Sequence, residues 1–321
     1  MKVTGAFLWM AVSVAVTGNA SAQGWPAKSI RFVSPYAPGG GSDILARSIG
    51  QKLSENLGVS VVIDNRPGAG GVVGTEIVTK SPPDGYTLML GTPAPITVAP
   101  SLLKKMPYDP LRDLTPITLV SIVPAVVAVH PSVPAKSIKE LVALAKTKPG
   151  QMTYSSSGNG GTAHLSGLML QTMAGIDIIH VPYRGTGPAL TAAMSGEVSF
   201  TAGNIISSLP MVKAGRVRAL AVTSEKRSPV LPDVPAVAET IPGYSAGPFY
   251  GVLGPGGMPA ELVNRIRNEI VKILHAPEMK NRLSAEGGEP IGSTPEVYAA
   301  LIRSETERWG RVIKAAKIQP E

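Results

Sequence analysis

Residues 30–49 read IRFVSPYAPGGGSDILARSI, and this stretch decides the fold. Its first four residues are rich in β-branched side chains, which predicts a strand. Two prolines and three glycines end the strand. From Ser42 apolar residues recur at helical spacing, so we expect a helix that Ser42 or Asp43 caps. Unpaired N–H groups at a helix start attract anions, and glycines let an anion approach the backbone closely. The stretch therefore predicts a cradle for a carboxylate or similar oxyanion; the alternative is a strand-to-helix turn without a ligand.

The composition indicates a folded chain of about two domains without thiol chemistry. Of its 321 residues, 44% are hydrophobic and 16% charged, so the chain can bury a large core, and about 150 residues per domain suggests two domains. Because cysteine is absent, disulfides, thiol nucleophiles and thiolate metal sites are excluded. The formal net charge of +8 comes from scattered basic residues and only 5% of residues are aromatic, so we expect no nucleic-acid partner.

The first 22 residues predict a secretory signal peptide. Lys2 supplies a positive charge, and residues 6–16 form an apolar run that is too short to span a bilayer comfortably. Ala20-Ser21-Ala22 then forms an A-x-A cleavage site. We expect cleavage after Ala22 and a periplasmic product; an uncleaved anchor is the alternative.

The next segments continue the alternation of strand and helix. We expect strands at residues 59–63 and 86–90, with a helix at residues 72–80 between them. This order predicts a mostly parallel sheet with helices on both faces, whose ligands lie at the carboxyl ends of the strands. Thr92 follows the third strand and falls at that edge together with residues 36–43.

The second half of the chain repeats the opening pattern. Residues 114–129 form a long apolar segment that can cross between domains, and a strand begins at residue 152. The loop 155–164, SSSGNGGTAH, then leads into a helix over residues 165–173. Two such cradles can close on one anion from both sides, and pockets between paired lobes are usual sites for small ligands.

Two further strand ends carry candidate ligand-binding residues. Tyr183 and Arg184 follow one predicted strand, and Gly203 and Asn204 follow the next. The guanidinium of Arg184 is suited to a carboxylate, although a surface salt bridge is the alternative. Tyr183 can supply a hydroxyl donor and a flat wall.

The motifs of several enzyme classes are missing or incomplete. Gly158, Gly160 and Ala163 fit a dinucleotide fingerprint, but the next strand lacks the acidic residue that this site requires at its end. The sequence contains no P-loop, no G-x-S-x-G and no H-E-x-x-H, and its four histidines are not paired at metal spacing. We therefore expect no cofactor, no metal site and no catalytic residues.

Asp43 and His164 each have two interpretations. A general-base role for Asp43 needs a nucleophile or a partner acid placed with it, and neither is evident, so we expect Asp43 to cap its helix or tie down its loop. His164 lies one turn into the helix of the second cradle. Contact with the ligand and a hydrogen bond to a neighbouring strand are both open there.

A series of motifs covers essentially all of the chain after the signal peptide. They are Tyr36-x-Pro38-Gly39-Gly40-x-Ser42-Asp43, residues 65–71 (NRPGAGG), residues 83–88 (PDGYTL), residues 106–110 (MPYDP), His164-Leu165, Val181-Pro182-Tyr183, Gly185, Pro188-Ala189 and residues 218–224 (RALAVTS). In these motifs the chain resembles the substrate-binding proteins of tripartite tricarboxylate transporters, the Bug-type receptors.

The resemblance implies a type II periplasmic binding protein of Venus-flytrap form. Each of its two α/β lobes would be a mixed, mostly parallel sheet flanked by helices, with a cleft between the lobes. It further implies that the protein binds a small organic carboxylate (a mono-, di- or tricarboxylic or aromatic acid) and hands it to a membrane permease. In the family, backbone groups and ordered waters of the two glycine loops hold the carboxylate, which points to residues 36–43 and 159–164; such water bridges are nearly as good as direct bonds.

The predicted ligand-binding residues come from these two loops and from other strand ends. They are Tyr36, Pro38, Gly39, Gly40, Gly41, Ser42, Asp43, Thr92, Asn159, Gly160, Gly161, Thr162, Ala163, His164, Tyr183, Arg184, Gly203 and Asn204. The chain departs from the family at Ala202-Gly203-Asn204, where many members have an aromatic residue, an aspartate and an asparagine. Losing the acid removes a partner for an amino group, and losing the aromatic ring opens space. We therefore expect a ligand without an ammonium group, such as a bulkier or aromatic carboxylate.

We expect a monomeric, non-enzymatic receptor whose first lobe comprises residues 23–122 and 226–321 and whose second comprises residues 123–225. Closure of the lobes around the ligand would be a hinge motion. One alternative is a periplasmic ligand-sensing protein of a signalling system. The other is an exported enzyme acting on a carboxylate, against which the missing nucleophile–base pair argues.

Overall fold

The computed structural model describes residues 24–285, 287–315 and 318. The predicted signal peptide lies outside these residues. Within them, no helix is long and apolar enough to cross a membrane.

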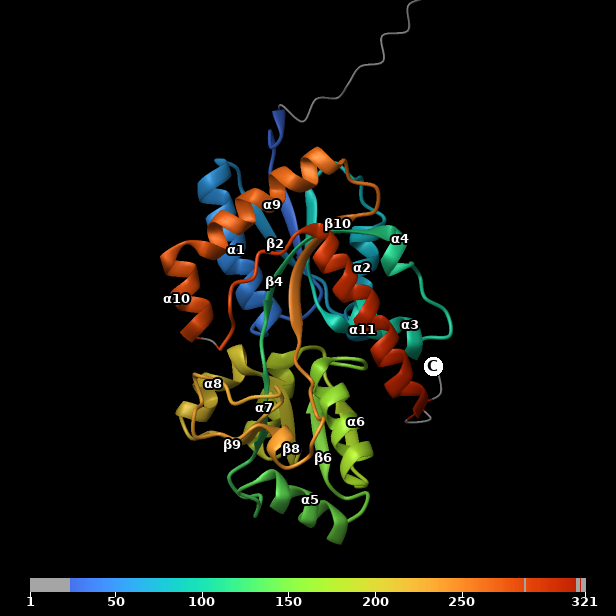
Figure 1. Ribbon diagram of the computed structural model, residues 1–321, viewed down its shortest axis with the longest axis vertical. Helices are drawn as coiled ribbons and strands as arrows, with labels where there is room; N and C mark the ends of the chain where they lie inside the picture. Colours follow the sequence, from blue (N-terminus) through green and yellow to red (C-terminus); the bar gives the residue numbers. More distant parts are fainter. Residues whose placement is uncertain (1–23, 286, 316–317, 319–321) are drawn as a thin grey trace, which may run out of the picture.

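Five strands form the first sheet, in the order β2-β1-β3-β10-β4 (Figure 1). They are β1 (Ile30–Ser34), β2 (Val61–Asn65), β3 (Thr87–Gly91), β4 (Leu114–Ile122) and β10 (Phe249–Pro255). β1 pairs in parallel with β2 and β3, whereas β10 is antiparallel to β3 and β4. The carboxyl ends of β1 and β3 therefore lie at one edge, as the sequence predicts.

The second sheet has the order β7-β6-β8-β5-β9. Its strands are β5 (Ala125–Val129), β6 (Thr153–Ser156), β7 (Ile179–Pro182), β8 (Phe200–Asn204) and β9 (Arg218–Val222). β6 is parallel to β7 and β8, and β5 is antiparallel to β8 and β9. The predicted α/β fold with two mixed sheets is confirmed.

Helices follow the strands in both halves. Those that accompany the first sheet are α1 (Gly41–Leu57), α2 (Val72–Thr79), α3 (Ala99–Leu102), α4 (Pro110–Asp113), α9 (Ala260–His275), α10 (Pro277–Ala285) and α11 (Pro295–Ala315), with the short turns η2 (Ala69–Gly71) and η3 (Ala94–Val98). Those that accompany the second sheet are α5 (Ile138–Thr147), α6 (Thr162–Ala174), α7 (Thr186–Ser195) and α8 (Ile205–Lys213), with η4 (Val237–Glu239).

Helix α1 shows how the opening stretch encodes its structure. Leu45, Ile49 and Leu53 recur at helical spacing and are almost completely buried. Burying each such side chain contributes roughly 1.5–3 kcal/mol. The helix ends at Gly58, whose φ of 68° is the left-handed conformation that glycine adopts without strain. The apolar stripe thus fixes the direction of α1, and its first turn stays at the carboxyl end of β1.

The chain crosses between the sheets twice, and the two crossings run side by side (Figure 1). The first leads from β4 to β5 through Val123 and Pro124. The backbone N–H of Val123 donates to the carbonyl of Pro248 on the returning segment (3.1 Å), and Phe249 pairs with Ile122. This paired crossing connects the two lobes.

The returning segment differs from the sequence-based boundary at residue 225. Ala236 bridges to Val222 of β9, and the N–H of Ala246 donates to the carbonyl of Thr223 (2.9 Å). The Tyr244 hydroxyl donates to the carbonyl of Ser166 in α6 (2.9 Å). These contacts attach residues 226–246 to the second sheet. We therefore propose that the second lobe comprises residues 123–246.

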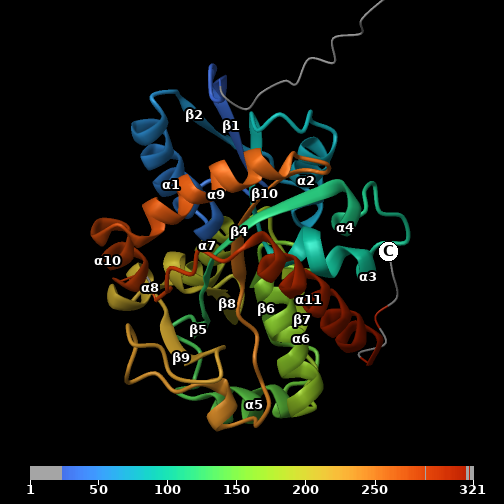
Figure 2. The ribbon, with the colours of Figure 1, turned by 45° about the horizontal axis from the view of Figure 1, so that its top comes forward.

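Helix α11 connects the two lobes. It begins on the first sheet, where the buried ring of Tyr298 meets Phe249 edge to face, and runs toward the second lobe (Figures 1 and 2). Near its end, the Arg308 guanidinium donates to the carbonyl of Ser245. The helix therefore contacts both lobes.

Candidate functional site

A small cavity lies between the two sheets, at the carboxyl ends of β1, β3 and β8. Its volume of about 30 Å³ is room for one or two water molecules. Its walls come from both halves of the chain. They are formed by Tyr36, Ser42, Thr92, Pro93, Ala94, Ser157, Thr162, Ala163, Thr186, Ala189, Thr201, Ala202, Gly203, Asn204, Pro248 and Tyr250.

None of these lining residues carries a formal charge at neutral pH. Half of them are hydroxyl residues, namely Tyr36, Ser42, Thr92, Ser157, Thr162, Thr186, Thr201 and Tyr250. The lining also includes the beginnings of four helices, since Ser42, Thr162 and Thr186 lie in the first turns of α1, α6 and α7, and Asn204 caps α8. Helix N-termini carry partial positive charge. The cavity thus has a positive potential and many donors without a side-chain cation, which suits an anion.

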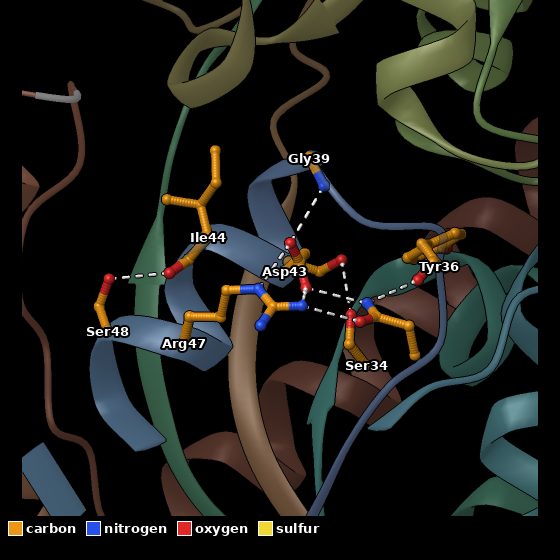
Figure 3. A network of polar contacts seen from close by, with 9 residues as sticks. Ser34, Tyr36, Gly39, Asp43, Ile44, Arg47 and Ser48 are labelled. Atoms are coloured by element: carbon orange, nitrogen blue, oxygen red, sulfur yellow. Dashed lines mark hydrogen bonds and ion pairs between the residues drawn. The ribbon is translucent and has the colours of Figure 1, made fainter. Parts of the chain in front are cut away.

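The first glycine loop is held by the carboxylate of Asp43, which is almost fully buried (Figure 3). This carboxylate accepts hydrogen bonds from the N–H of Gly39 (3.0 Å) and the amide of Asn65 (2.9 Å), and pairs with Arg47 (3.0 Å). Burial alone would raise the pKa of Asp43, but the bonds from Arg47, Gly39 and Asn65 together outweigh it and lower that pKa. Asp43 therefore ties down the loop, and it is not among the residues that line the cavity.

Tyr36 fastens the same loop to its neighbours. Its hydroxyl lies 3.1 Å from the carbonyl of Gly70 and 3.1 Å from Oγ1 of Thr92. Burial raises the pKa of Tyr36 to about 12, so the hydroxyl keeps its proton and remains a donor. Tyr36 thus contributes a neutral hydroxyl to the wall of the cavity.

The second glycine loop is held by His164. Its Nδ1 accepts a hydrogen bond from the N–H of Gly160 (2.9 Å), which requires an unprotonated Nδ1 and therefore a neutral ring. The ring stacks on His180 at 4.1 Å, and Nε2 of His180 lies 2.5 Å from the hydroxyl of Ser156. His164 thus holds the loop through its hydrogen bond with Gly160 and does not line the cavity.

This histidine pair predicts a loss of stability in mild acid. Burial lowers the pKa of His164 to about 4, and burial together with the charge of His164 lowers that of His180 to about 3. Because both values lie below the unfolded value of 6.5, the unfolded chain binds more protons, and stability falls as the pH drops below 6.5. From His164 alone we expect a loss of about 2 kcal/mol in the free energy of unfolding between pH 7 and pH 5.

Urea unfolding at the two pH values measures this loss. The pH 7–5 window lies above the range in which most carboxylates titrate. The variant His164→Gln, combined with His180→Gln, is expected to flatten the dependence. An equal pH dependence in this variant would assign the effect to other groups.

The structure distributes the predicted site residues over three locations. Those in the cavity lining are Tyr36, Ser42, Thr92, Thr162, Ala163, Gly203 and Asn204. Those that line an adjoining outer chamber are Asn159, Tyr183 and Arg184, together with Tyr36. Those in neither lining are Pro38, Gly39, Gly40, Gly41, Asp43, Gly160, Gly161 and His164.

Two of the predicted glycines lie where the lobes approach each other. A Cβ atom at Gly41 would lie 2.8 Å from Oδ1 of Asn204 and 2.8 Å from the hydroxyl of Tyr250, and one at Gly40 would touch Thr186 at 3.4 Å. These glycines therefore leave room for Asn204 and Thr186 of the opposite lobe.

Several lining residues were not predicted as site residues. Tyr250 belongs to the apolar strand β10, and its buried hydroxyl accepts a hydrogen bond from the Asn204 amide. A tyrosine in an otherwise apolar strand signals a hydroxyl that needs a partner. Thr186 follows Gly185 at a helix start, and this third copy of the glycine–hydroxyl–helix pattern was a usable signal. Thr201 sits within the strand β8, where nothing marks it.

No metal site accompanies the cavity. Within the part of the chain that the structure describes, no group of three His, Asp or Glu side chains is placed to hold a metal ion.

Comparison with known proteins assigns the family. Residues 45–318 match the model of the tripartite tricarboxylate transporter family receptor. BugT of Bordetella pertussis is 34% identical over 319 residues, covering 98% of each chain. Rpa4515 of R. palustris, solved with adipate, superposes with a TM-score of 0.89 at 37% identity over 92% of this chain and all of that one. The periplasmic binding protein BugD gives a TM-score of 0.89 at 31% identity, again over 92% of this chain and all of that one.

These similarities extend over both sheets, so the arrangement of two lobes is that of type II periplasmic binding proteins, as the sequence predicts. The chain belongs to the receptor family of the tripartite tricarboxylate transporters, the Bug-type solute-binding proteins.

Proposed function

We propose that this protein is a periplasmic receptor that captures a small organic carboxylate between its lobes and delivers it to a tripartite tricarboxylate-type membrane transporter. The observation that carries the proposal is the cavity itself, which is lined by hydroxyls and four helix starts and by no charged side chain. Such a site stabilises an anion through partial charges and hydrogen bonds. The structural relative Rpa4515, solved with adipate, supports the same ligand class.

The proposed ligand lacks an ammonium group. An ammonium requires a carboxylate or a set of acceptors, and no aspartate or glutamate lines the cavity. At the position where many family members have an aspartate, this chain has Gly203, which lines the cavity without a side chain. Glutamate and aspartate are therefore expected to bind weakly or not at all.

Binding requires the lobes to move. A cavity of about 30 Å³ admits a carboxylate head or a water or two but no complete organic acid. We propose that the lobes separate about the paired crossing at Val123 and Pro248 and close again on the ligand. The ligand would then enter through the gap that opens between the two lobes.

We further propose that the protein is a non-enzymatic monomer that is exported by its signal peptide and cleaved after Ala22. Asp43, the candidate base, is engaged by Arg47, Asn65 and the backbone of Gly39. Those bonds leave it in the ionised state and out of the cavity lining, which argues against catalysis.

A thermal-stability panel tests this function. The mature chain, residues 23–321, is heated with mono-, di- and tricarboxylates, aromatic acids and amino acids. A ligand at 100 times its dissociation constant adds about 2.7 kcal/mol to the free energy of unfolding. Stabilisation by one class of carboxylates, and recovery of that acid unchanged by mass spectrometry, is the expected result. A flat panel with no co-purified acid in the denatured sample would contradict the receptor function, and conversion of the acid would indicate an enzyme.

A further inference from the structure

A second hollow, with a volume of about 590 Å³, lies beside the paired crossing between the lobes. We name it the hinge-side groove, since the lobes are proposed to move about this crossing. Gly247 and Phe249 of the returning segment line the groove, whereas Pro248 and Tyr250 line the cavity. Because alternate residues of an extended segment face opposite sides, the groove and the cavity lie on opposite sides of this segment. The groove is therefore separate from the carboxylate site.

The walls of the hinge-side groove are partly formed by exposed apolar side chains. Ile122 is 48% exposed and Ile291 is 37% exposed, and both line the groove together with Phe249 and Leu301. The two isoleucines belong to neighbouring segments, because the N–H of Ile291 donates to the carbonyl of Val120, which lies on the same strand as Ile122 (3.0 Å). Concave spaces of about 300–1,000 Å³ with apolar walls are typical of small-molecule sites.

One buried polar group in the lining has no partner in the protein. Ser228 is only 4% exposed, and its hydroxyl makes no hydrogen bond within the part of the chain that the structure describes. Buried hydroxyls are normally hydrogen-bonded, so a ligand atom that reaches Ser228 would supply the missing partner. This unpaired hydroxyl points to a ligand independently of the apolar walls.

The charges around the hinge-side groove favour a cation. The guanidinium of Arg227 is paired with the carboxylate of Glu239 (2.8 Å). That of Arg308 is paired with the carboxylate of Glu305 (3.2 Å). The other charged lining residues, which form no ion pair with any residue that the structure describes, are Glu225, Glu289 and Lys226. The groove thus has one carboxylate in excess, whereas the cavity suits an anion.

We propose that the hinge-side groove is a second ligand site, which binds an organic ammonium ion with an apolar body and thereby favours closure of the lobes. The apolar body lies against Ile122 and Ile291, where burial of apolar surface stabilises it. The ammonium group lies beside Glu289, two residues before Ile291, and is attracted by its carboxylate. The site thus takes a ligand of opposite charge to that of the cavity.

The effect on closure follows from the origin of the walls. Leu301 belongs to the first lobe and Ser228 to the second, so a movement of the lobes changes the shape of the groove. The lobes touch in the arrangement described here, since a Cβ atom at Gly158 would lie 3.3 Å from Cα of Gly70. A ligand that fits the groove in this arrangement stabilises it and raises the affinity for a carboxylate between the lobes. This effect rests on the proposed function, whereas ammonium binding itself does not.

Titration of the mature protein with n-hexylammonium chloride, followed by amide chemical shifts, tests the site. The N–H signals of Ile122, Ser228 and Ile291 should move together and saturate. In Ile122→Lys, which places a cation in the groove, we expect the affinity for hexylammonium to fall about tenfold or more. Val62→Lys is the matched control, because Val62 is a similarly exposed β-branched residue on the other edge strand of the same sheet and lies outside both linings. It should bind hexylammonium as the wild type does.

Titration calorimetry with adipate, with and without saturating hexylammonium, tests the effect on closure. We expect the affinity for adipate to rise about 5-fold or more in the wild type and in Val62→Lys, but not in Ile122→Lys. The proposal would be overturned by an absence of shifts at the groove, by equal hexylammonium affinities of the two lysine variants, or by an unchanged affinity for adipate. Failure of the wild type to bind any carboxylate would instead refute the proposed function, on which the shifts at the groove do not depend.

Discussion

Replacing Asn204 with aspartate is expected to weaken carboxylate binding by roughly 100-fold or more, because it places a negative charge in a cavity that has none. Two like charges about 5 Å apart repel by about 3 kcal/mol at an effective dielectric constant of about 20. The fold should tolerate the change. Asn204 caps α8 by accepting a hydrogen bond from the N–H of Ile206 (2.8 Å), and aspartate caps helices equally well.

Titration calorimetry at pH 8, where the new aspartate is ionised, measures the loss. The control is Asn268→Asp on the exposed surface of α9, which changes the net charge equally but lies outside the cavity lining. It should bind as the wild type does. Retained affinity in Asn204→Asp, with an unchanged melting temperature, would show that the anion does not sit beside Asn204.

Replacing Gly70 with alanine is expected to hinder closure of the lobes and to weaken binding about 5- to 150-fold, the range set by an overpacking cost of about 1–3 kcal/mol. Gly70 lies in η2 of the first lobe, and a Cβ atom there would overlap the carbonyl oxygen of Asn159 in the second glycine loop. Because the obstacle is backbone, a rotamer change cannot relieve it. The overlap therefore makes the closed arrangement less stable relative to the open one.

Gly58→Ala separates this effect from backbone strain. Gly58 has a φ of 68°, close to the 63° of Gly70, but a Cβ atom at Gly58 would meet nothing within 4 Å. Both variants should lose similar stability, and only Gly70→Ala should lose affinity. Small-angle scattering with saturating adipate should also give a larger radius of gyration for Gly70→Ala. If the two variants bound the ligand with equal affinity, Gly70 would not contact the second glycine loop in the ligand-bound state.

The sequence was most informative where local patterns repeat. The strand–glycine–helix units that begin at residues 30 and 152 predicted β1 with α1 and β6 with α6. The apolar spacing and the glycines that encode each unit lie within about 20 residues of one another, so they can be read from the sequence alone. The return boundary that we propose lies about 20 residues beyond the one predicted from the sequence. Residues 226–246 contain no regular strand, and they are held to the second lobe by contacts such as Tyr244 with Ser166, whose partner lies 78 positions away. A single sequence carries no local signal for such a contact.

The site was predicted in part for the same reason. The two loops and Thr92 were found because they follow strands, and the role of Asp43 in tying down its loop agrees with its network of hydrogen bonds. Whether a loop residue faces the cavity or its own lobe depends on the backbone torsion angles of the loop and on the packing of both lobes around it. The sequence therefore could not separate Ser42, which lines the cavity, from Gly39 or His164, which do not. Tyr250 comes from a strand about 200 residues beyond the first loop, so only the folded topology places it there.

Amide chemical shifts of the mature protein during titration with adipate test the central claim most directly. If the helix starts hold the carboxylate, the N–H signals of residues 41–43 and 162–164 should move together and saturate with one dissociation constant. Shifts confined to a different region, such as the hinge-side groove around Ile122 and Arg227, or no shifts with any carboxylate, would contradict the account.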